Sequence, residues 1–204
     1  MFFQGSLFGS CRPDVDADFL DARRLDLDDR SWIEHTPGWL RGADTLFDEL
    51  LDCLEFRQRD GIKMYDSLVA EPRLTATWHA DDHPTGGPTP LLDDIGHLLI
   101  VRHHRPFDSI GFNLYRDGAD SVAWHGDRHH RYVTDPVVAI LSVGQRRALK
   151  IRPKGGGQSL SWDLGHGDLF VMGGSCQHDW EHCVPKVRRH VGPRLSITYR
   201  HDTR

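Results

Sequence analysis

The sequence predicts a mainly β domain with flanking helices, built as a β-sandwich or jelly roll. Two observations predict this class. After residue 105, short apolar runs recur between Gly, Pro and Asp residues, which is typical of short strands joined by turns. Before that point, two segments each carry a single apolar stripe, which is typical of helices packed on a core. A length of 204 residues favours a single domain.

Composition excludes several classes of protein. The chain is 38% hydrophobic, with a net charge of −5, as expected for a globular protein. It has no apolar run of about 18 residues, so we expect no membrane span. Its first residues lack the features of a secretory signal. Four scattered cysteines without a Cys-x-x-Cys motif indicate a reducing compartment, so a cytoplasmic location is the default expectation.

The predicted elements follow in order along the chain. Residues 1–40 are rich in Gly, Pro and Asp and are predicted to be irregular. Asp44–Leu54 is predicted to be a helix because its leucines share one face. Residues 62–78 are predicted to form short strands, and His79–Pro90 a loop. Pro90–His104 is predicted to be a second helix with Pro90 in its first turn, where a missing N–H costs little.

The remaining strands are predicted from their apolar runs. They are Ile110–Tyr115, Val122–Trp124, Val137–Val143, Leu149–Ile151, Leu160–Leu164, Leu169–Met172 and Leu195–Tyr199. Basic residues gather between and after these strands, and residues 145–204 carry 11 Lys/Arg against 5 Asp/Glu. Two basic groups are candidates for phosphate contacts or for simple surface solubility: Arg146, Arg147, Lys150, Arg152 and Lys154, and then Lys186, Arg188, Arg189 and His190.

The first candidate for chemistry is His125-Gly126-Asp127. In a strand, residues two apart point to the same face, so the imidazole and the carboxylate converge. Two His and one carboxylate with open positions are typical of non-haem Fe(II) oxygenases. His178 and His182 compete to be the third ligand. We favour His182 because it opens an extended segment, and we interpret His178 as a surface or supporting group.

Two further strands carry polar side chains on one face. Alternation in residues 194–200 puts Arg194, Ser196, Thr198 and Arg200 on one side, where they suit a small dicarboxylate. The alternative is an amphipathic strand with its polar side in water. Asn113 and Tyr115 also share a face, and each is able to hydrogen-bond a carboxylate.

The ordered set of Asn113-Leu114-Tyr115, His125-x-Asp127, His182 and Arg194-x-Ser-x-Thr-x-Arg200 resembles the AlkB family of Fe(II)/2-oxoglutarate dioxygenases, over about residues 62–201. The resemblance implies a double-stranded β-helix and implies Fe(II), 2-oxoglutarate and O₂ as cofactor and cosubstrates. It implies that the iron ligands are His125, Asp127 and His182. It places Asn113, Tyr115, Arg194, Ser196 and Arg200 around 2-oxoglutarate. The family usually has Asn where this chain has Ser196, whose hydroxyl still forms hydrogen bonds.

The resemblance also implies oxidative removal of alkyl groups from bases in nucleic acid, either single-stranded or base-flipped DNA, or RNA. Residues 1–60 would form an N-terminal arm and helix, residues 61–204 the dioxygenase domain, and residues 62–90 a nucleotide lid. In the lid, Trp78 is the candidate platform for the base, with Tyr65 as a weaker candidate and a core tryptophan as the alternative. The family often has an acidic base-reading residue where this chain has His129, preceded by Arg128, so both are candidate substrate contacts.

Two other functions stay open at this point. One is the same iron chemistry on a protein side chain or a small metabolite, because residues 1–144 carry 14 Lys/Arg against 25 Asp/Glu. The other is a non-catalytic β-barrel that holds zinc, although structural zinc sites are usually closed by four ligands and no fourth ligand is evident. A monomer without membrane contact is expected.

Overall fold

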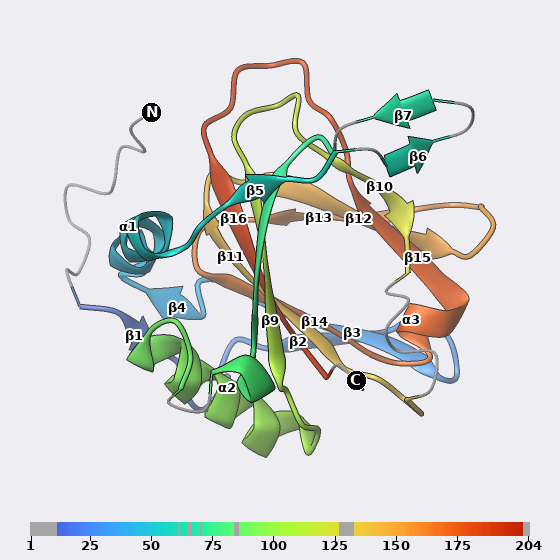
Figure 1. Ribbon diagram of the computed structural model, residues 1–204. Coiled ribbons are helices and arrows are strands. Elements are labelled where there is room, and N and C mark those ends of the chain that lie inside the picture. The colour runs from blue at the N-terminus through green and yellow to red at the C-terminus, as the bar shows by residue number, and fades with distance from the viewer. Residues whose placement is uncertain are drawn as a thin grey trace.

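Two antiparallel β-sheets face each other in the computed structural model, and two helices cover the outer face of the larger sheet (Figure 1). The structure describes residues 12–60, 62–64, 67–69, 71–83, 86–126 and 133–201. The larger sheet has the strand order β2-β3-β14-β11-β16-β9-β8-β5, and the smaller has β10-β15-β12-β13. This is the predicted jelly roll, and the described residues include more in strands than in helices.

The bounds of the elements are as follows. The strands are β1 (Asp14–Val15), β2 (Arg23–Asp26), β3 (Ser31–Thr36), β4 (Leu40–Arg41), β5 (Arg57–Gln58), β6 (Ile62–Met64), β7 (Ser67–Val69), β8 (Leu74–His79), β9 (Ser109–Tyr115), β10 (Val122–His125), β11 (Val138–Gly144), β12 (Arg147–Pro153), β13 (Leu160–Leu164), β14 (Asp168–Gly174), β15 (Trp180–Val184) and β16 (Arg194–Arg200). The helices are α1 (Ala43–Cys53), α2 (Pro90–His103), α3 (Cys176–Asp179) and the 3₁₀ turn η1 (Ala80–Asp82).

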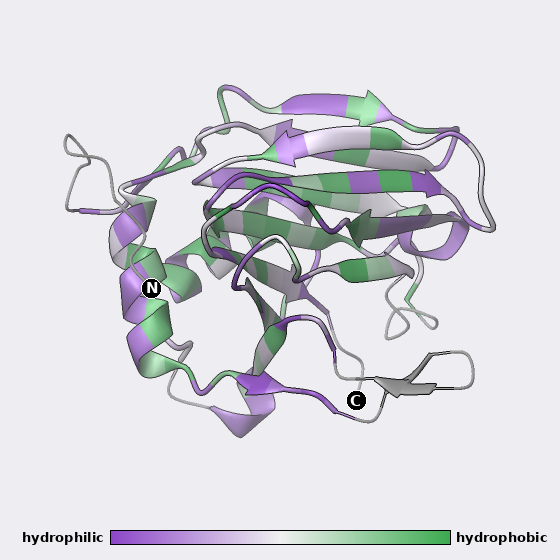
Figure 2. Ribbon diagram, turned by 90° about the horizontal axis from the view of Figure 1, so that it is seen from above, coloured by the Kyte–Doolittle hydropathy of each residue, from purple (hydrophilic) through white to green (hydrophobic). Residues whose placement is uncertain are grey.

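The larger sheet has an apolar core on each face. On one side it packs against α1 and α2, which bury Leu46, Leu50 and Leu99. On the other side it packs against the smaller sheet. Successive side chains of a strand point to opposite faces. Both faces of the central strands contribute apolar residues to a core, so stretches of green run through the middle of the fold in Figure 2. Each central strand therefore sends one set of side chains to the helices and the other set into the space between the sheets.

Both predicted helices are confirmed to within one residue. In α2, Thr89 Oγ1 accepts a hydrogen bond from Leu92 N at 3.3 Å, and Pro90 occupies the first turn as predicted. The helix ends at His104, which adopts a left-handed conformation with φ 53°. The buried Tyr199 of β16 donates its hydroxyl hydrogen bond to Leu92 O at 2.9 Å, which fastens this helix to the sheet. No helix among the described residues is long and apolar enough to cross a membrane.

The predicted strands after residue 105 are all present. Residues 1–11 lie outside the described residues, and the irregular structure predicted for residues 1–40 was wrong for residues 12–40. Within this segment, β2 and β3 pair in the larger sheet, and β3 lies against β14 along its whole length. Polar residues hid β3, because Glu34 and His35 interrupt its apolar pattern. Each has a partner inside the fold: Glu34 Oε2 accepts from Arg102 at 2.9 Å, and His35 Nε2 lies 3.0 Å from Asp168 Oδ2.

Candidate functional site

Two of the three predicted metal ligands lie side by side on neighbouring strands of the smaller sheet. His125 of β10 and His182 of β15 are direct partners in antiparallel register, and their ring centroids are 4.3 Å apart. His125 Nδ1 lies 2.8 Å from Ala123 O. Because a carbonyl oxygen only accepts hydrogen bonds, this contact places the proton of neutral His125 on Nδ1 and the lone pair on Nε2. That tautomer is the one expected of a metal ligand.

The third predicted ligand, Asp127, lies outside the described residues. Among the residues that are described, no three His, Cys, Asp or Glu side chains gather as a metal cluster. Gly126, between His125 and Asp127, lies against the chain that leads to His182. A Cβ at Gly126 would lie 2.8 Å from Gln177 O, so only glycine allows this approach. The register of β10 against β15 is also irregular between Val122 and His125. The side chains at the end of β10 therefore do not follow the simple alternation between the two faces of the sheet.

The structure separates His182 from its competitor His178. His182 is buried within β15, whereas His178 lies on α3, where its Nε2 is 3.2 Å from Val133 O. His178 therefore ties α3 to the segment that leads into β11. The expectation that His182 opens an extended segment was wrong in detail, because β15 begins two residues earlier, at Trp180.

The polar face of β16 is buried between the sheets and does not face water. Arg194 is 1% exposed, and its Nε donates a hydrogen bond to Ser142 Oγ at 2.9 Å. Neither of its Nη atoms makes a hydrogen bond to a described residue, and the same is true of Arg200 Nε. Ser196 and Thr198, on the same face, are buried as well. The amphipathic alternative, with this face in solvent, is excluded.

The predicted partners on β9 lie directly beside these residues. Asn113 pairs with Ser196, and Tyr115 pairs with Arg194, in the register of β9 and β16. The guanidinium Cζ atoms of Arg194 and Arg147 lie 5.3 Å and 5.5 Å from the centroid of the Tyr115 ring. Burial raises the pKa of the Tyr115 phenol, although both neighbouring arginines favour its ionised form. Tyr115 is thus a neutral hydrogen-bonding group at ordinary pH.

A residue that the sequence analysis missed completes this wall. Arg73 Nε donates a hydrogen bond to Asn113 Oδ1 at 2.8 Å, and Arg73 Nη2 contacts Glu71 Oε1 at 3.2 Å. The sequence shows only that Arg73 and Thr75 are two residues apart and share a face; the pairing of Thr75 with Asn113, which brings Arg73 to the site, comes from the fold. Ser142, which supports Arg194, was missed too, because its run Val138–Val143 is otherwise apolar.

These donors fit 2-oxoglutarate, the dicarboxylate that the resemblance implies. A buried guanidinium with two unused Nη atoms is costly in an apolar interior unless an anion binds it. Burial also lowers the pKa of Arg194, yet an arginine stays protonated under all ordinary conditions. The described interior thus offers a charged bidentate donor, together with the amide of Asn113 and the phenol of Tyr115, for a ligand with two carboxylates.

The predicted substrate contacts are less complete. Trp78 pairs with Ile110 and packs with the helix-side core, and its Nε1 donates to Gly86 O at 3.2 Å. The structure therefore does not bring Trp78 into the space between the sheets that holds His182. This placement corresponds to the alternative of a core tryptophan, because Trp78 has the parity of the outer face of β8. Tyr65, Arg128 and His129 lie outside the described residues.

The first group of candidate phosphate contacts is largely engaged within the protein. Arg147 is buried and donates to three backbone carbonyls, Asp117 O, Asp120 O and Pro185 O, at 2.8 to 2.9 Å. Its proposed phosphate contact was wrong. Arg152 pairs with Glu181 at 2.6 Å and lies over the ring of Trp124 at 4.1 Å. The second group, Lys186, Arg188, Arg189 and His190, is exposed.

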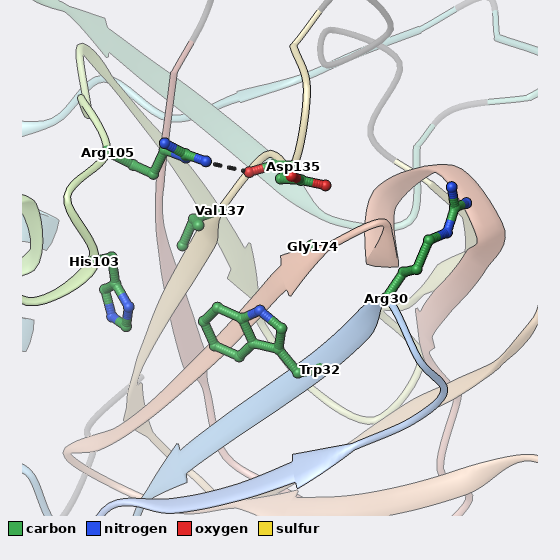
Figure 3. A pocket seen from close by; sticks show the side chains of 7 residues that line it. All are labelled: Arg30, Trp32, His103, Arg105, Asp135, Val137 and Gly174. Carbon is green, nitrogen blue, oxygen red and sulfur yellow. Dashed lines mark hydrogen bonds between the residues drawn. The ribbon is translucent and has the colours of Figure 1, made fainter.

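A separate pocket of about 460 Å³ opens beside the end of α2 (Figure 3). Its walls come from α2, β3, the end of β14 and the segment before β11: Arg30, Trp32, His103, Arg105, Asp135, Val137 and Gly174. The arginines are already engaged, because Arg30 pairs with Asp179 at 2.7 Å and Arg105 Nε donates to Asp135 O at 3.4 Å. None of the candidate site residues lines this pocket.

Comparisons with known proteins identify the family of the chain. Residues 75–200 match the model of the 2OG-Fe(II) oxygenase superfamily. The chain is 33% identical to alpha-ketoglutarate-dependent dioxygenase alkB homolog 3 of Bos taurus and 31% identical to its Homo sapiens counterpart, in each case over 80% of this chain and 64% of the relative. It is 30% identical to the DNA oxidative demethylase ALKBH2 of Arabidopsis thaliana, over 82% of this chain and 59% of that relative. The chain thus spans less than two thirds of the length of these relatives.

Proposed function

The chain belongs to the AlkB family of the 2OG-Fe(II) oxygenase superfamily, and from this we propose that it oxidatively demethylates alkylated bases in nucleic acid. The family uses Fe(II), 2-oxoglutarate and O₂. The observation that carries the proposal is the pair of unpartnered Nη atoms on buried Arg194, next to the interior polar side chains of β9. A non-catalytic zinc protein would have no use for that charge.

We assign metal binding and 2-oxoglutarate binding to different groups of residues in the interior. We assign His125 and His182 to the metal, with Asp127 as the third ligand. Arg194 would bind the distal carboxylate of 2-oxoglutarate, and Arg200 would support the end that chelates iron. When bound, the iron centre with 2-oxoglutarate and O₂ supplies the oxidation, giving succinate, CO₂ and an oxidised methyl group that leaves as formaldehyde. Burial of His182 and Arg194 keeps bulk water from these two side chains.

Nucleic acid as the substrate is supported by the relatives, one of which is named a DNA oxidative demethylase. The exposed basic segment of Lys186, Arg188 and Arg189 provides charges for phosphates. A second candidate substrate is a protein side chain or a small metabolite. The position of Trp78 on the helix side favours this second candidate, because it removes the aromatic platform predicted for a flipped base.

One assay separates these candidates. Formaldehyde and succinate are measured with Fe(II), 2-oxoglutarate and O₂ on a single-stranded oligonucleotide that carries N1-methyladenine or N3-methylcytosine, with His125→Ala as the blank. Formaldehyde in step with succinate, lost in His125→Ala, is the expected result. Succinate without formaldehyde would move the substrate to a protein or metabolite. If neither formaldehyde nor succinate forms, that result contradicts the catalytic proposal.

A further inference from the structure

The segment before β8 delivers an additional arginine to the predicted cosubstrate site. Arg73 precedes the first residue of β8, and its side chain is only 15% exposed. Since Thr75 lies opposite Asn113 in the register of β8 and β9, Arg73 shares the interior parity of this strand. Its positive charge also favours the ionised form of the Tyr115 phenol, against the larger effect of burial, which raises the pKa of that group.

The contact between Arg73 and Asn113 has a defined orientation. Arg73 Nε donates to Asn113 Oδ1 at 2.8 Å. Because a guanidinium nitrogen only donates hydrogen bonds, the amide atom that it contacts must be the oxygen. The amide nitrogen Nδ2 makes no hydrogen bond to another described residue, and it lies on the same face as Ser196, the partner of Asn113 on β16. Arg73 therefore decides which end of the amide is free to donate to a ligand.

Arg73 is itself held in place before any ligand binds. Its Nη2 contacts Glu71 Oε1 at 3.2 Å, and the Glu71 side chain is 14% exposed. The backbone on either side is fixed, since Ser121 N donates to Pro72 O at 2.7 Å and Glu71 N donates to Arg59 O at 2.8 Å. The carboxylate of Glu71 offsets the positive charge of Arg73, so the contribution of Arg73 to the site is more one of orientation than of net charge.

We propose that Arg73 is a positioning residue for 2-oxoglutarate that acts through Asn113. It holds Oδ1 and thereby presents Nδ2 as a donor to the dicarboxylate. Without Arg73, the amide is free to turn, and an oxygen that faces a carboxylate is repelled by it. The inference rests on the proposed use of 2-oxoglutarate, and it is independent of which substrate is demethylated.

A double-mutant cycle tests this directly. The affinity for 2-oxoglutarate is measured by calorimetric titration of the Fe(II)-loaded protein without O₂, for the wild type, Arg73→Gln, Asn113→Ala and the double variant. We expect Arg73→Gln and Asn113→Ala each to weaken binding by about tenfold, the size of one lost charge-assisted hydrogen bond. In the Asn113→Ala background, Arg73→Gln is expected to have no further effect. The matched control is Arg57→Gln, an exposed arginine of β5 paired with Glu55, which should bind as the wild type does.

Each other outcome is informative. An Arg73→Gln effect that persists undiminished in the Asn113→Ala background would mean that Arg73 acts by its own contact or charge, which overturns the proposal. Unchanged affinity in Arg73→Gln would overturn it too. A wild type that does not bind 2-oxoglutarate would overturn the proposed function and this inference together. If Arg73→Gln does not fold, Arg73→Lys replaces it, with an expected loss of about threefold in the wild-type background and none beside Asn113→Ala.

Discussion

At the scale of single residues, the interior of this protein contains a charge that the fold alone does not stabilise. Arg194 is 1% exposed, its Nε donates a hydrogen bond to Ser142 Oγ, and the Tyr115 phenol also favours its charged form. The neighbouring buried arginine, Arg147, differs because its two Nη atoms bind three carbonyls. Arg147 is therefore a structural residue, whereas Arg194 is arranged for a ligand.

This difference predicts opposite effects of the same substitution. Arg194→Met removes a poorly compensated charge, so the free energy of unfolding without ligand should stay unchanged or rise by about 1–2 kcal/mol. Affinity for 2-oxoglutarate should fall by about a hundredfold, because a buried bidentate pair is lost. Arg147→Met should instead destabilise the protein by about 2–4 kcal/mol, because three carbonyls lose their donor. Urea unfolding and calorimetric titration measure both. Strong destabilisation by Arg194→Met would contradict this account.

Alternation along the chain predicted which side chains share a face, and not which face is buried. Arg194 and Ser196 share a face in any strand, in water or in a core. Only the position of β16 between β11 and β9 in the larger sheet decides that the face is interior. Trp78 shows the converse. An aromatic residue in a segment resembling a lid was expected beside the substrate, but the parity of β8 places it against the helices.

At the scale of elements, the pairing of β3 with β14 depends on a glycine. The indole of Trp32 lies over Gly173, where a Cβ would be 2.2 Å from Trp32 Cζ2. The ring has little room to move, because the Arg24 guanidinium lies 4.4 Å from its centroid and the His103 ring 5.9 Å away. In α2, by contrast, a Cβ at Gly96 would meet only Tyr199 Cε1 at 3.6 Å.

Two alanine substitutions should therefore move stability in opposite directions. Gly173→Ala should lower the free energy of unfolding by about 2–3 kcal/mol, since the indole must be displaced. Gly96→Ala should raise it by about 0.5–1 kcal/mol, because alanine favours the interior of a helix. Urea denaturation at neutral pH measures both values. A neutral Gly173→Ala would show that Trp32 does not pack as described.

The end of α2 also predicts a pH dependence. Burial lowers the pKa of His103 to about 4 from 6.5, and Arg102, Arg24 and His104 act in the same direction against Glu34. Because the folded pKa lies below the unfolded one, the unfolded state binds more protons between these values. The contribution of His103 therefore leaves the free energy of unfolding at its full value above pH 6.5 and lowers it as the pH drops toward 4.

When the pH is lowered from 7.5 to 5, His103 should therefore reduce the free energy of unfolding by about 1–2 kcal/mol. His103→Gln should remove that part of the pH dependence, and His104→Asn, at the adjacent exposed position, should retain it. Urea midpoints at the two pH values measure the effect. An equal fall in the wild type and in His103→Gln would assign the pH dependence to other groups.

The N-terminal strands show why some elements escape prediction from the sequence. The run Ser31–Thr36 alternates poorly, since it is buried on both faces and two of its polar members, Glu34 and His35, are paired with distant residues. Those partners, Arg102 and Asp168, belong to α2 and β14 and are invisible in a local window. The two helices were predicted almost to the residue because their stripes, and the proline and threonine at the start of α2, are local signals.

At the scale of the whole molecule, the jelly roll joins two halves of one site. The smaller sheet aligns His125 with His182, and the larger sheet aligns Tyr115 with Arg194. Strand pairing of this kind is not encoded in any local pattern, and the order of the motifs predicted it only through the family resemblance. The interior between the sheets would thus receive the two described histidines of the proposed metal site from one side and the proposed cosubstrate donors from the other.

The most direct test of this account is the stoichiometry of Fe(II) binding in the absence of O₂, measured for the wild type and for two histidine variants. We predict one Fe(II) per chain in the wild type, its loss in His182→Ala, and its retention in His178→Ala. His178 is a matched control because it lies in the neighbouring helix α3 and contacts a backbone carbonyl. Loss of iron in His178→Ala with retention in His182→Ala would contradict the assignment of the metal site.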